Sequence, residues 1–214
     1  MKTETVFRQC VRKACMFRFP GPDGETFNCP KCGASTTVVA LIPQYDQIRG
    51  AEEALSNGLH LEAGLDNLRS ILNVGSIFRT ADAVGITHLH LFGMTPTPVH
   101  PRMQKTALGA ESFLPWTQHW DGLAAVRELK KDGFFILALE KTRDSQNLFT
   151  FPPLAESQKI HLIVGNENSG TDPGILAESD QILHLPMVGN KESLNVANAF
   201  SAAVYWLRFG MSSG

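Results

Sequence analysis

All four cysteines of the chain lie within its first 32 residues and form two pairs. Four residues separate Cys10 from Cys15, two separate Cys29 from Cys32, and Gly33 follows the second pair. Two such pairs are typical of a structural zinc site, because Zn²⁺ prefers four thiolates in a tetrahedral arrangement. The competing interpretation is four reduced thiols without metal. We expect Cys10, Cys15, Cys29 and Cys32 to bind zinc, which would supply most of the folding energy of so small a segment.

Charge is distributed unevenly along the chain. The formal net charge of −2 excludes a uniformly basic nucleic-acid binder. Residues 1–32 nevertheless carry six basic against three acidic side chains, or +3, which leaves 13 minus 18, or −5, for the remainder. A basic segment favours a polyanion as its partner, although an ordinary solvated surface is the alternative. The six basic residues are Lys2, Arg8, Arg12, Lys13, Arg18 and Lys31. We expect Phe17, Phe19 and Phe27 to form a small core there rather than to stack on bases.

Residues 73–85 are the first of three later segments with chemical potential. Asn73 is expected to cap a helix, and Gly75 to let another chain or a ligand approach the backbone closely. A guanidinium at Arg79 can hold a phosphate with paired hydrogen bonds. The competing interpretation is a helix cap and a surface arginine paired with Asp82.

The second segment, residues 164–170, follows an apolar run and holds two glycines and the carboxylate of Glu167. Its spacing matches neither a dinucleotide fingerprint nor a P-loop, and Glu167 facing solvent is the alternative. The third segment, residues 185–197, leads from a strand into a helix. Ser193 is expected to cap this helix, with Asn195 in the first turn, where free N–H groups can hold a ligand.

Elements that position these segments alternate between short apolar runs and helical patterns. The expected strands are residues 35–42, 88–92, 134–139, 160–164 and 182–185, and the expected helices are residues 75–84, 123–131, 172–178 and 194–209. This alternation predicts an α/β fold, a mostly parallel sheet with helices on both faces and ligands at the carboxyl ends of its strands. We expect a zinc-ribbon-like segment over residues 1–42, a helix-containing linker over residues 43–58 and one larger domain over residues 59–214.

Together the three segments resemble the SpoU/TrmH-like branch of the SPOUT RNA methyltransferases. The family's motifs occur in order, as residues 73–85, as Gly165-Asn166-Glu167 with Gly170, and as Pro186 through Ser193-Leu194-Asn195. The resemblance covers roughly residues 59–210, without a departure at the family's key positions. Residues 105–111, ahead of Pro115-Trp116, also look like a connecting segment seen in some of these proteins.

The resemblance implies an α/β domain whose C-terminal part forms a trefoil knot, and a homodimer whose active site is completed at the subunit interface. It implies S-adenosylmethionine bound in the knot, largely through backbone groups. The matching positions are Gly165, Leu185 and Leu194, with Met187 nearby and Leu139 as a weaker match.

The implied reaction is methyl transfer to a ribose 2′-hydroxyl of RNA, either tRNA or rRNA. Arg79 is assigned to the RNA phosphate and to the hydroxyl proton, with Asn73, Glu167, Ser193 and Asn195 shaping the catalytic pocket. A guanidinium is a poor base, so this role needs the adjacent phosphate or a relay.

Two other functions compete with this interpretation. A non-catalytic RNA-binding protein that keeps the fold is the first. The second, a nicotinamide-dependent oxidoreductase, lacks its glycine fingerprint. The chain has no apolar run of membrane-spanning length and no signal-like apolar core in residues 1–15, so we expect a cytoplasmic protein.

Overall fold

The computed structural model describes residues 4–24, 26–42, 59–155 and 158–210. The chain divides into two compact units, Met1–Ala51 and Glu52–Gly214, which are described separately below. The expected linker over residues 43–58 lies outside the described residues. The domain boundaries drawn from the sequence therefore stay predictions.

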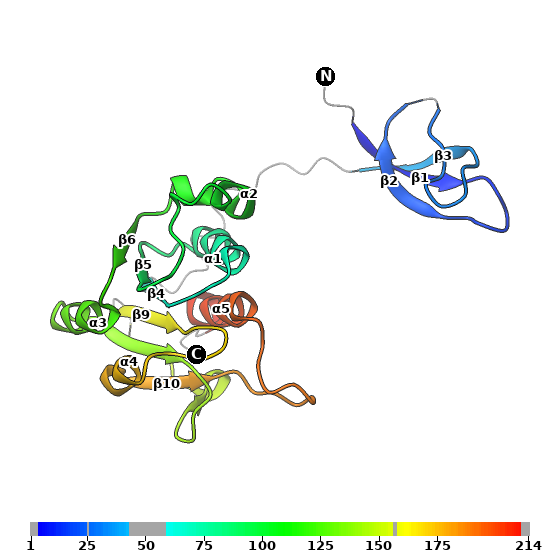
Figure 1. The fold of residues 1–214 in the computed structure, drawn as a ribbon. Helices are drawn as coiled ribbons and strands as arrows, with labels where there is room; N and C mark the ends of the chain where they lie inside the picture. The colour runs from blue at the N-terminus through cyan, green and yellow to red at the C-terminus, as the bar shows by residue number, and fades with distance from the viewer. Residues whose placement is uncertain (1–3, 25, 43–58, 156–157, 211–214) are drawn as a thin grey trace. The chain divides into compact units, whose positions relative to one another are not determined.

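The first unit is a three-stranded antiparallel sheet with strand order β2-β1-β3 (Figure 1). Its strands are β1 (Thr5–Cys10), β2 (Arg18–Pro22) and β3 (Thr36–Leu41). The strand expected over residues 35–42 is confirmed as β3. The cysteine pairs lie at the ends of these strands and in the turns between them, so the sheet brings the two pairs together.

Arg8, on β1, is buried within this unit and only 1% exposed. Its guanidinium donates to Thr36 Oγ1 at 2.9 Å and to the carbonyls of Pro22 and Gly24 at 3.0 and 2.9 Å. A buried cation so fully hydrogen-bonded holds strands together instead of meeting a ligand. Arg8 is therefore not available to a polyanion, and the prediction that it belongs to the basic surface of residues 1–32 is wrong.

The second unit contains a seven-stranded sheet with order β6-β5-β4-β9-β7-β10-β8, and all its pairings are parallel. The strands are β4 (His60–Asp66), β5 (Leu89–Phe92), β6 (Trp116–His119), β7 (Phe135–Leu139), β8 (Gln146–Asn147), β9 (Lys159–Val164) and β10 (Gln181–His184). The four strands expected in this region are confirmed as β5, β7, β9 and β10. The remaining strands, including the inner strand β4, were not predicted.

Helices cover both faces of this sheet, as predicted (Figure 1). They are α1 (Ile71–Ala83), α2 (Met103–Ala107), α3 (Gly122–Lys131), α4 (Pro173–Glu178) and α5 (Val196–Tyr205), which continues into a π-helical turn, Trp206–Gly210. On one face Phe78 of α1 and Phe200 of α5 pack with Leu61 of β4. On the other, Val126 of α3 and Ile175 of α4 pack in a separate apolar cluster. None of the helices in the described part of the chain is long and apolar enough to cross a membrane.

The beginnings of α1 and α5 differ from the predictions. Ser70 caps α1, accepting a hydrogen bond from Asn73 N, so Asn73 lies in the first turn and is not the cap. Conversely, Asn195 caps α5 by accepting from Ala197 N and Asn198 N, and Ser193 lies ahead of the cap. Both errors have one physical reason. Ser and Asn are good caps by type, and only the backbone geometry selects which one accepts the free N–H groups.

Gly75 serves the packing of α1 on α2. A Cβ at this position would lie 2.1 Å from Thr106 Oγ1 and 2.9 Å from the Thr106 carbonyl carbon. The close approach expected at Gly75 is therefore made by α2 of the same chain, not by a ligand or a second chain.

Candidate active site

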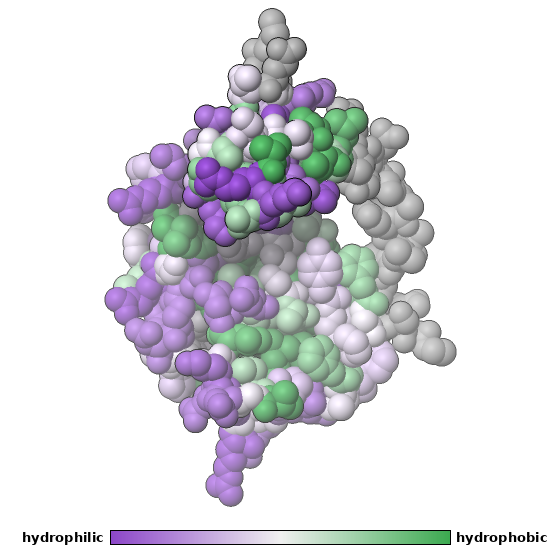
Figure 2. Space-filling model, turned by 90° about the vertical axis from the view of Figure 1, so that its right-hand side faces the viewer, coloured by the Kyte–Doolittle hydropathy of each residue, from purple (hydrophilic) through white to green (hydrophobic). Residues whose placement is uncertain are grey.

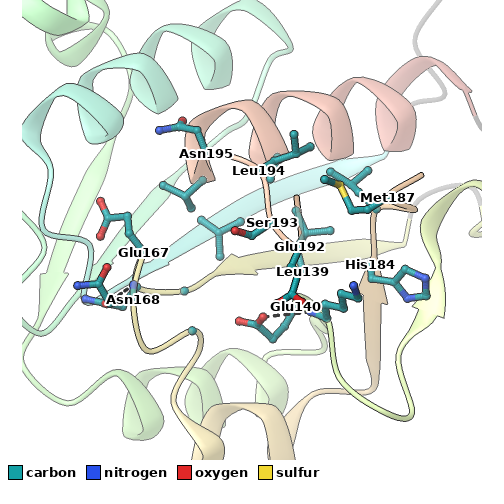
Figure 3. A pocket seen from close by; sticks show the side chains of 18 residues that line it. Leu139, Glu140, Glu167, Asn168, His184, Met187, Glu192, Ser193, Leu194 and Asn195 are labelled. Carbon is teal, nitrogen blue, oxygen red and sulfur yellow. Dashed lines mark hydrogen bonds between the residues drawn. The ribbon is translucent and has the colours of Figure 1, made fainter. Parts of the chain in front are cut away.

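A cavity of about 530 Å³ lies at the carboxyl ends of β7, β9 and β10 (Figure 3). This is the edge at which parallel α/β sheets bind ligands, and the volume falls within the range of small-molecule sites. Three loops surround the cavity, from Leu139 to Lys141, from Gly165 to Gly170 and from Leu185 to Val196. All five positions expected to bind the cofactor line it, namely Leu139, Gly165, Leu185, Met187 and Leu194.

The loop after β9 is held tightly by its own backbone. Asn166 and Gly170 exchange backbone hydrogen bonds of 3.1 and 2.9 Å, with Gly170 at a φ of +73°. A Cβ on Gly165 would lie 2.2 Å from Thr171 N, so the close turn requires glycine there. Asn166 Nδ2 also donates to the Asn67 carbonyl at 2.6 Å. These contacts fix the position of Glu167 at the rim of the cavity.

Glu167 joins this loop to the N-terminus of α1. Its carboxylate accepts from Arg69 N at 3.0 Å, from Ser70 N at 3.1 Å and from Asn73 Nδ2 at 2.9 Å. A carboxylate at a helix N-terminus is stabilised by the free N–H groups and the helix dipole. Burial alone would raise the pKa of Glu167, but the hydrogen bonds from its own backbone amide, Arg69, Asn73 and Ser70 outweigh it and lower the pKa. Glu167 is thus a charged group whose side chain is exposed to solvent but whose carboxylate is held in place by hydrogen bonds.

Asn195 extends the same network to α5. Its Nδ2 donates to Asn73 Oδ1 at 3.0 Å, while its Oδ1 accepts from Ala197 N at 3.0 Å. Glu167, Asn73 and Asn195 therefore form one hydrogen-bonded chain beside the cavity, and Ser193 lines the cavity itself. Four of the five expected catalytic residues are brought together in this way.

Arg79, the fifth, does not reach this cavity within the chain. It follows Asn73 by six positions, which corresponds to about 9 Å along the axis and a side chain turned well away. Exposed on α1, it lines a separate hollow of about 320 Å³ with Ser76, Thr80, Ala83 and Tyr205. Among the described residues the Arg79 side chain has no hydrogen bond or ion pair, so the alternative pairing with Asp82 is absent there.

Several lining residues were missed from the sequence. Glu140 and Lys141 directly follow β7, and His184 ends β10. The Glu140 carboxylate accepts from Thr171 N and Lys141 N, both at 3.0 Å, and so supports the loop after β9. These residues lie at the ends of expected strands, and this edge of a parallel sheet binds ligands. Their position in the sequence could therefore have predicted that they line the cavity.

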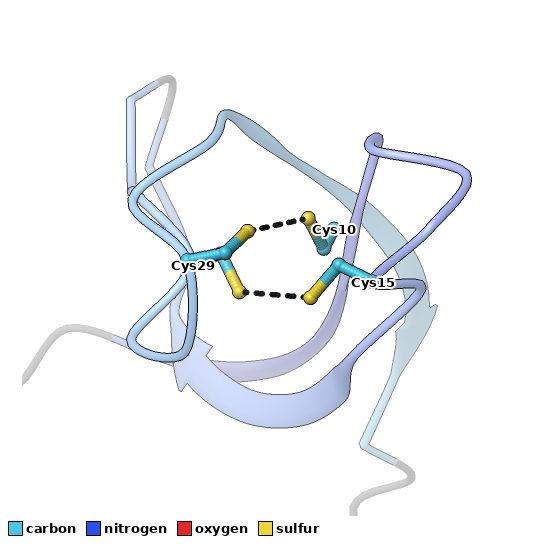
Figure 4. A group of neighbouring side chains, drawn as sticks. Cys10, Cys15 and Cys29 are labelled. Atoms are coloured by element: carbon cyan, nitrogen blue, oxygen red, sulfur yellow. Dashed lines mark hydrogen bonds between the residues drawn. The ribbon is translucent and has the colours of Figure 1, made fainter.

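In the first unit, the four cysteines form a second candidate site (Figure 4). Their sulfurs all lie within 4.8 Å of one another, with Cys10 and Cys32 Sγ 3.5 Å apart and Cys15 and Cys29 Sγ 3.9 Å apart. A tetrahedral Zn²⁺ with bonds of about 2.3 Å places its sulfurs about 3.8 Å apart, so the arrangement fits this ion. Burial raises the pKa of Cys10 to about 12, and a backbone hydrogen bond at Ala34 lowers the pKa of Cys32 to about 7.

The backbone around the cysteines is shaped in the same way at both pairs. Gly33, at a φ of +71°, makes the turn after the second pair, as expected. After the first pair this left-handed conformation is taken by Met16, at a φ of +48°. The small core consists mainly of the cysteines and Phe19, whereas Phe17 and Phe27 are exposed. Phe19 is thus buried in this core as expected, and the partly exposed rings of Phe17 and Phe27 pack against it, with centroids 5.3 and 6.0 Å from that of Phe19.

Fold and cavity together define an α/β protein with a small-molecule site at the carboxyl edge of a parallel sheet. Residues 60–205 match the SpoU rRNA Methylase family, and the chain belongs to that family.

The relatives that the chain matches in sequence include RNA methyltransferases. The chain is 32% identical over 144 residues to the 23S rRNA (guanosine(2553)-2'-O)-methyltransferase RlmP of Bacillus subtilis, covering 67% of this chain and 56% of that one. It is 34% identical over 133 residues to the tRNA (guanosine(18)-2'-O)-methyltransferase of Escherichia coli, covering 62% and 56%. The chain thus spans somewhat over half the length of the relatives it matches.

Solved structures show the same fold. An AdoMet-bound rRNA methyltransferase from Sinorhizobium meliloti superposes with a TM-score of 0.66 at 25% identity, over 72% of this chain and 57% of that one. The TrmH/SpoU tRNA modifying enzyme of A. aeolicus gives a TM-score of 0.62 at 26% identity, over 72% and 77%.

Proposed function

We propose that this protein transfers a methyl group from S-adenosylmethionine to a ribose 2′-hydroxyl of a structured RNA, either tRNA or rRNA. One observation carries the proposal. In a chain of the SpoU family, the Glu167–Asn73–Asn195 network stands beside a cavity lined by all five expected cofactor positions. S-adenosylmethionine, when bound, supplies a methyl group already activated on a sulfonium. The protein therefore has mainly to position and deprotonate the acceptor.

The lining of the cavity fits this cofactor. Leu139, Leu185 and Leu194 offer apolar surface for an adenine ring, with Met187 beside them. Glu140, Glu167 and Glu192 place carboxylates around the same cavity, and these attract a cationic sulfonium and ammonium. Strand ends also offer backbone groups that can read the edge of the base. The trefoil knot implied by the resemblance belongs to this proposal.

Glu167, Asn73 and Asn195 act as positioning residues. Their hydrogen bonds hold the loop after β9, the first turn of α1 and the cap of α5 in one arrangement. Glu167 is a weak proton acceptor at neutral pH because its pKa is lowered. The hydroxyl proton then passes to an RNA phosphate oxygen or to water, with Arg79 holding the phosphate.

A homodimer would bring Arg79 to a cavity it does not reach within its own chain. In a two-fold dimer the same surface of each subunit meets its partner, so each α1 can deliver its arginine to the other subunit. Exposed apolar side chains on and near α1 and α5 support such an interface, with Leu72, Tyr205 and Phe209 exposed by 65%, 48% and 37%. Figure 2 shows one face of the molecule, on which apolar (green) residues lie beside polar (purple) ones.

The first unit is proposed to bind zinc through its four cysteines and to help hold the RNA. Arg12, Lys13, Arg18 and Lys31 are exposed, as are the rings of Phe17 and Phe27. Replacing Arg12 and Lys13 by Ala is expected to weaken RNA binding. The slope of log affinity against log salt concentration should also become shallower, by about 0.7–0.9 for each phosphate that the variant no longer neutralises. Unchanged affinity at every salt concentration would remove this unit from RNA binding.

Methylation of isolated tRNA and rRNA with labelled S-adenosylmethionine, followed by mapping of the modified ribose, tests the reaction. Arg79→Ala is expected to abolish transfer while calorimetry still shows cofactor binding. Arg127→Ala, which removes an exposed arginine of α3 paired with Glu178, is the matched control and retains activity. Label found on a base and not on a ribose would overturn the reaction type. Failure to bind the cofactor would instead favour a non-catalytic RNA-binding protein.

A further inference from the structure

A cluster of histidines surrounds Glu62 on the sheet face opposite α1 and α5. His60 and Glu62 lie on β4, His90 on β5 and His161 on β9. Strand register brings these residues together, because Glu62 pairs directly with His161 across β4 and β9, and His90 pairs with Gly64 across β4 and β5. Positions two apart on a strand share a face, so Glu62 and Gly64 point the same way.

Most members of the cluster are hydrogen-bonded to one another. Glu62 Oε2 lies 2.9 Å from His90 Nε2, and Glu62 Oε1 lies 3.1 Å from His60 Nε2. On its other side, His90 Nδ1 lies 3.0 Å from His119 Nε2 of β6. Both carboxylate oxygens of Glu62 are thus directed at imidazole nitrogens, one at His90 and one at His60.

His161 is the exception. It is fully buried, at 0% exposure, and neither ring nitrogen has a hydrogen-bond partner among the described residues. A buried polar group without a hydrogen-bond partner destabilises a fold unless a ligand satisfies it. The site nevertheless admits the imidazole, because a Cβ on Gly64 would lie only 2.7 Å from His161 Nε2. This imidazole, a charged carboxylate and a second imidazole together have the composition of a metal-ligand set.

We infer that Glu62, His90 and His161 form a binding site for a divalent transition metal ion, Zn²⁺ in the first instance. Their ligand atoms lie within 4.8 Å of one another. Tetrahedral zinc with bonds of about 2.0–2.1 Å needs donors about 3.3 Å apart, a spacing reached by small side-chain movements. Two imidazoles and one carboxylate suit Zn²⁺, Co²⁺ or Ni²⁺ better than Mg²⁺ or Ca²⁺, which prefer oxygen.

The neighbours of the three ligands support them. With His90 Nε2 on the metal, its Nδ1–H donates to His119 Nε2, which fixes the ring as outer hydrogen bonds do at metal sites. Both ring nitrogens of His161 are free of hydrogen-bond partners among the described residues, so either one is available for coordination. His60, with 42% of its side chain exposed, marks the side from which solvent reaches Glu62. Such an ion would tie β4, β5 and β9 together on this face.

Metal content of the full-length protein tests the inference. After equilibration with Zn²⁺ and removal of free ion by gel filtration, His161→Leu is expected to hold one ion fewer per chain than the wild type. His100→Ala, which removes an exposed histidine outside the cluster, is the matched control and keeps the wild-type content. Cys29→Ser distinguishes the two sites. It should lose the ion held by the cysteines and keep the ion held by Glu62, His90 and His161.

Circular dichroism shows whether His161→Leu is folded. A folded His161→Leu with the metal content of the wild type would overturn the inference. If His161→Leu fails to fold, Glu62→Gln gives the same test at nearly constant size. Added Zn²⁺ should also raise the Tm of Cys29→Ser but not that of Cys29→Ser combined with Glu62→Gln. Equal shifts in the two would count against this site.

Discussion

The side chains of Asn73 and Asn195, 122 positions apart in the sequence, are joined by a hydrogen bond of 3.0 Å from Asn195 Nδ2 to Asn73 Oδ1. Asn73 uses its own Nδ2 to donate to Glu167 Oε1 at 2.9 Å. Because an amide offers its oxygen and its nitrogen at different ends, these partners fix the orientation of both side chains. One continuous network thus sets the relative positions of the three segments beside the cavity.

Asn195 has two separable roles, capping α5 and contacting Asn73. Asn195→Ala removes both and is expected to destabilise the fold by about 1 kcal/mol, the usual effect of losing a cap. Asn195→Asp keeps the cap acceptor but loses the donor to Asn73. It should be nearly as stable as the wild type in urea, yet methylate at least about tenfold more slowly, since about 1.4 kcal/mol of lost positioning changes a rate tenfold. Asn147→Asp, at the cap Asn147 of a 3₁₀ turn, is the control. Full activity in Asn195→Asp would show that the hydrogen bond to Asn73 is dispensable.

Glu167 predicts a specific response to acid. Its pKa in the fold is lowered from the ordinary 4.5, so its stabilising contribution is present above that value and is lost as the pH falls through the lowered pKa. Glu167→Gln has no such titration. Between about pH 5 and pH 3, the free energy of unfolding of the wild type should fall more steeply than that of Glu167→Gln. Parallel curves from urea unfolding at each pH would contradict this.

Mixed dimers test whether Arg79 acts on the partner's cavity. Arg79→Ala alone should be inactive, and Asn195→Ala alone should retain at most about a tenth of wild-type activity, since it also loses the contact with Asn73. The two variants are then co-expressed with different tags. In a heterodimer, the cavity of the Arg79→Ala subunit keeps its own Asn195 and receives the intact Arg79 of the Asn195→Ala subunit. A statistical mixture would then show about one quarter of wild-type activity, since half the dimers carry one working site of two. No recovered activity in purified heterodimers would place Arg79 and Asn195 in the same chain's site.

Removal of a cysteine ligand should affect the two units unequally. Cys29→Ser is expected to lose the ion held by the cysteines and the order of the first unit, because the core there consists largely of the cysteines themselves. All three tryptophans, Trp116, Trp120 and Trp206, lie in the second unit. Tryptophan fluorescence should therefore report an unchanged unfolding transition while zinc content falls by one ion per chain. A shifted tryptophan transition would show that the units stabilise each other.

The sequence predicted the apolar strands of the sheet and missed the polar ones. The strand β7 was recognisable as a continuous apolar run, and β9 as an apolar run from Ile160 to Val164 interrupted only by His161, as expected for strands buried on both faces. In β4, by contrast, His60, Glu62 and Gly64 interrupt the apolar pattern. These residues face the histidine cluster, so their burial depends on partners from other strands. No local pattern contains that information.

The sequence predicted which residues form the candidate site, but not which of them contact one another. The motifs identified Asn73, Glu167 and Asn195, and the structure places them in one hydrogen-bonded network. Which residue caps each helix was not predictable, since Ser70 and Asn73 suit the position equally by type. The direction of Arg79, by contrast, follows from the predicted helix, because six positions on a helix turn its side chain well away from that of Asn73.

The pairing of β4 with β9 has a consequence for how the protein is made. During synthesis β4 leaves the ribosome long before its neighbour, and the register from His60–Lys159 to Leu65–Val164 can form only when β9 follows. Until then an inner strand has one open edge, the kind of surface that recruits strands from other chains. Distant pairing of this sort also slows folding. Nascent or truncated chains ending before Val164 are thus the forms of this protein most prone to aggregate and most dependent on chaperones.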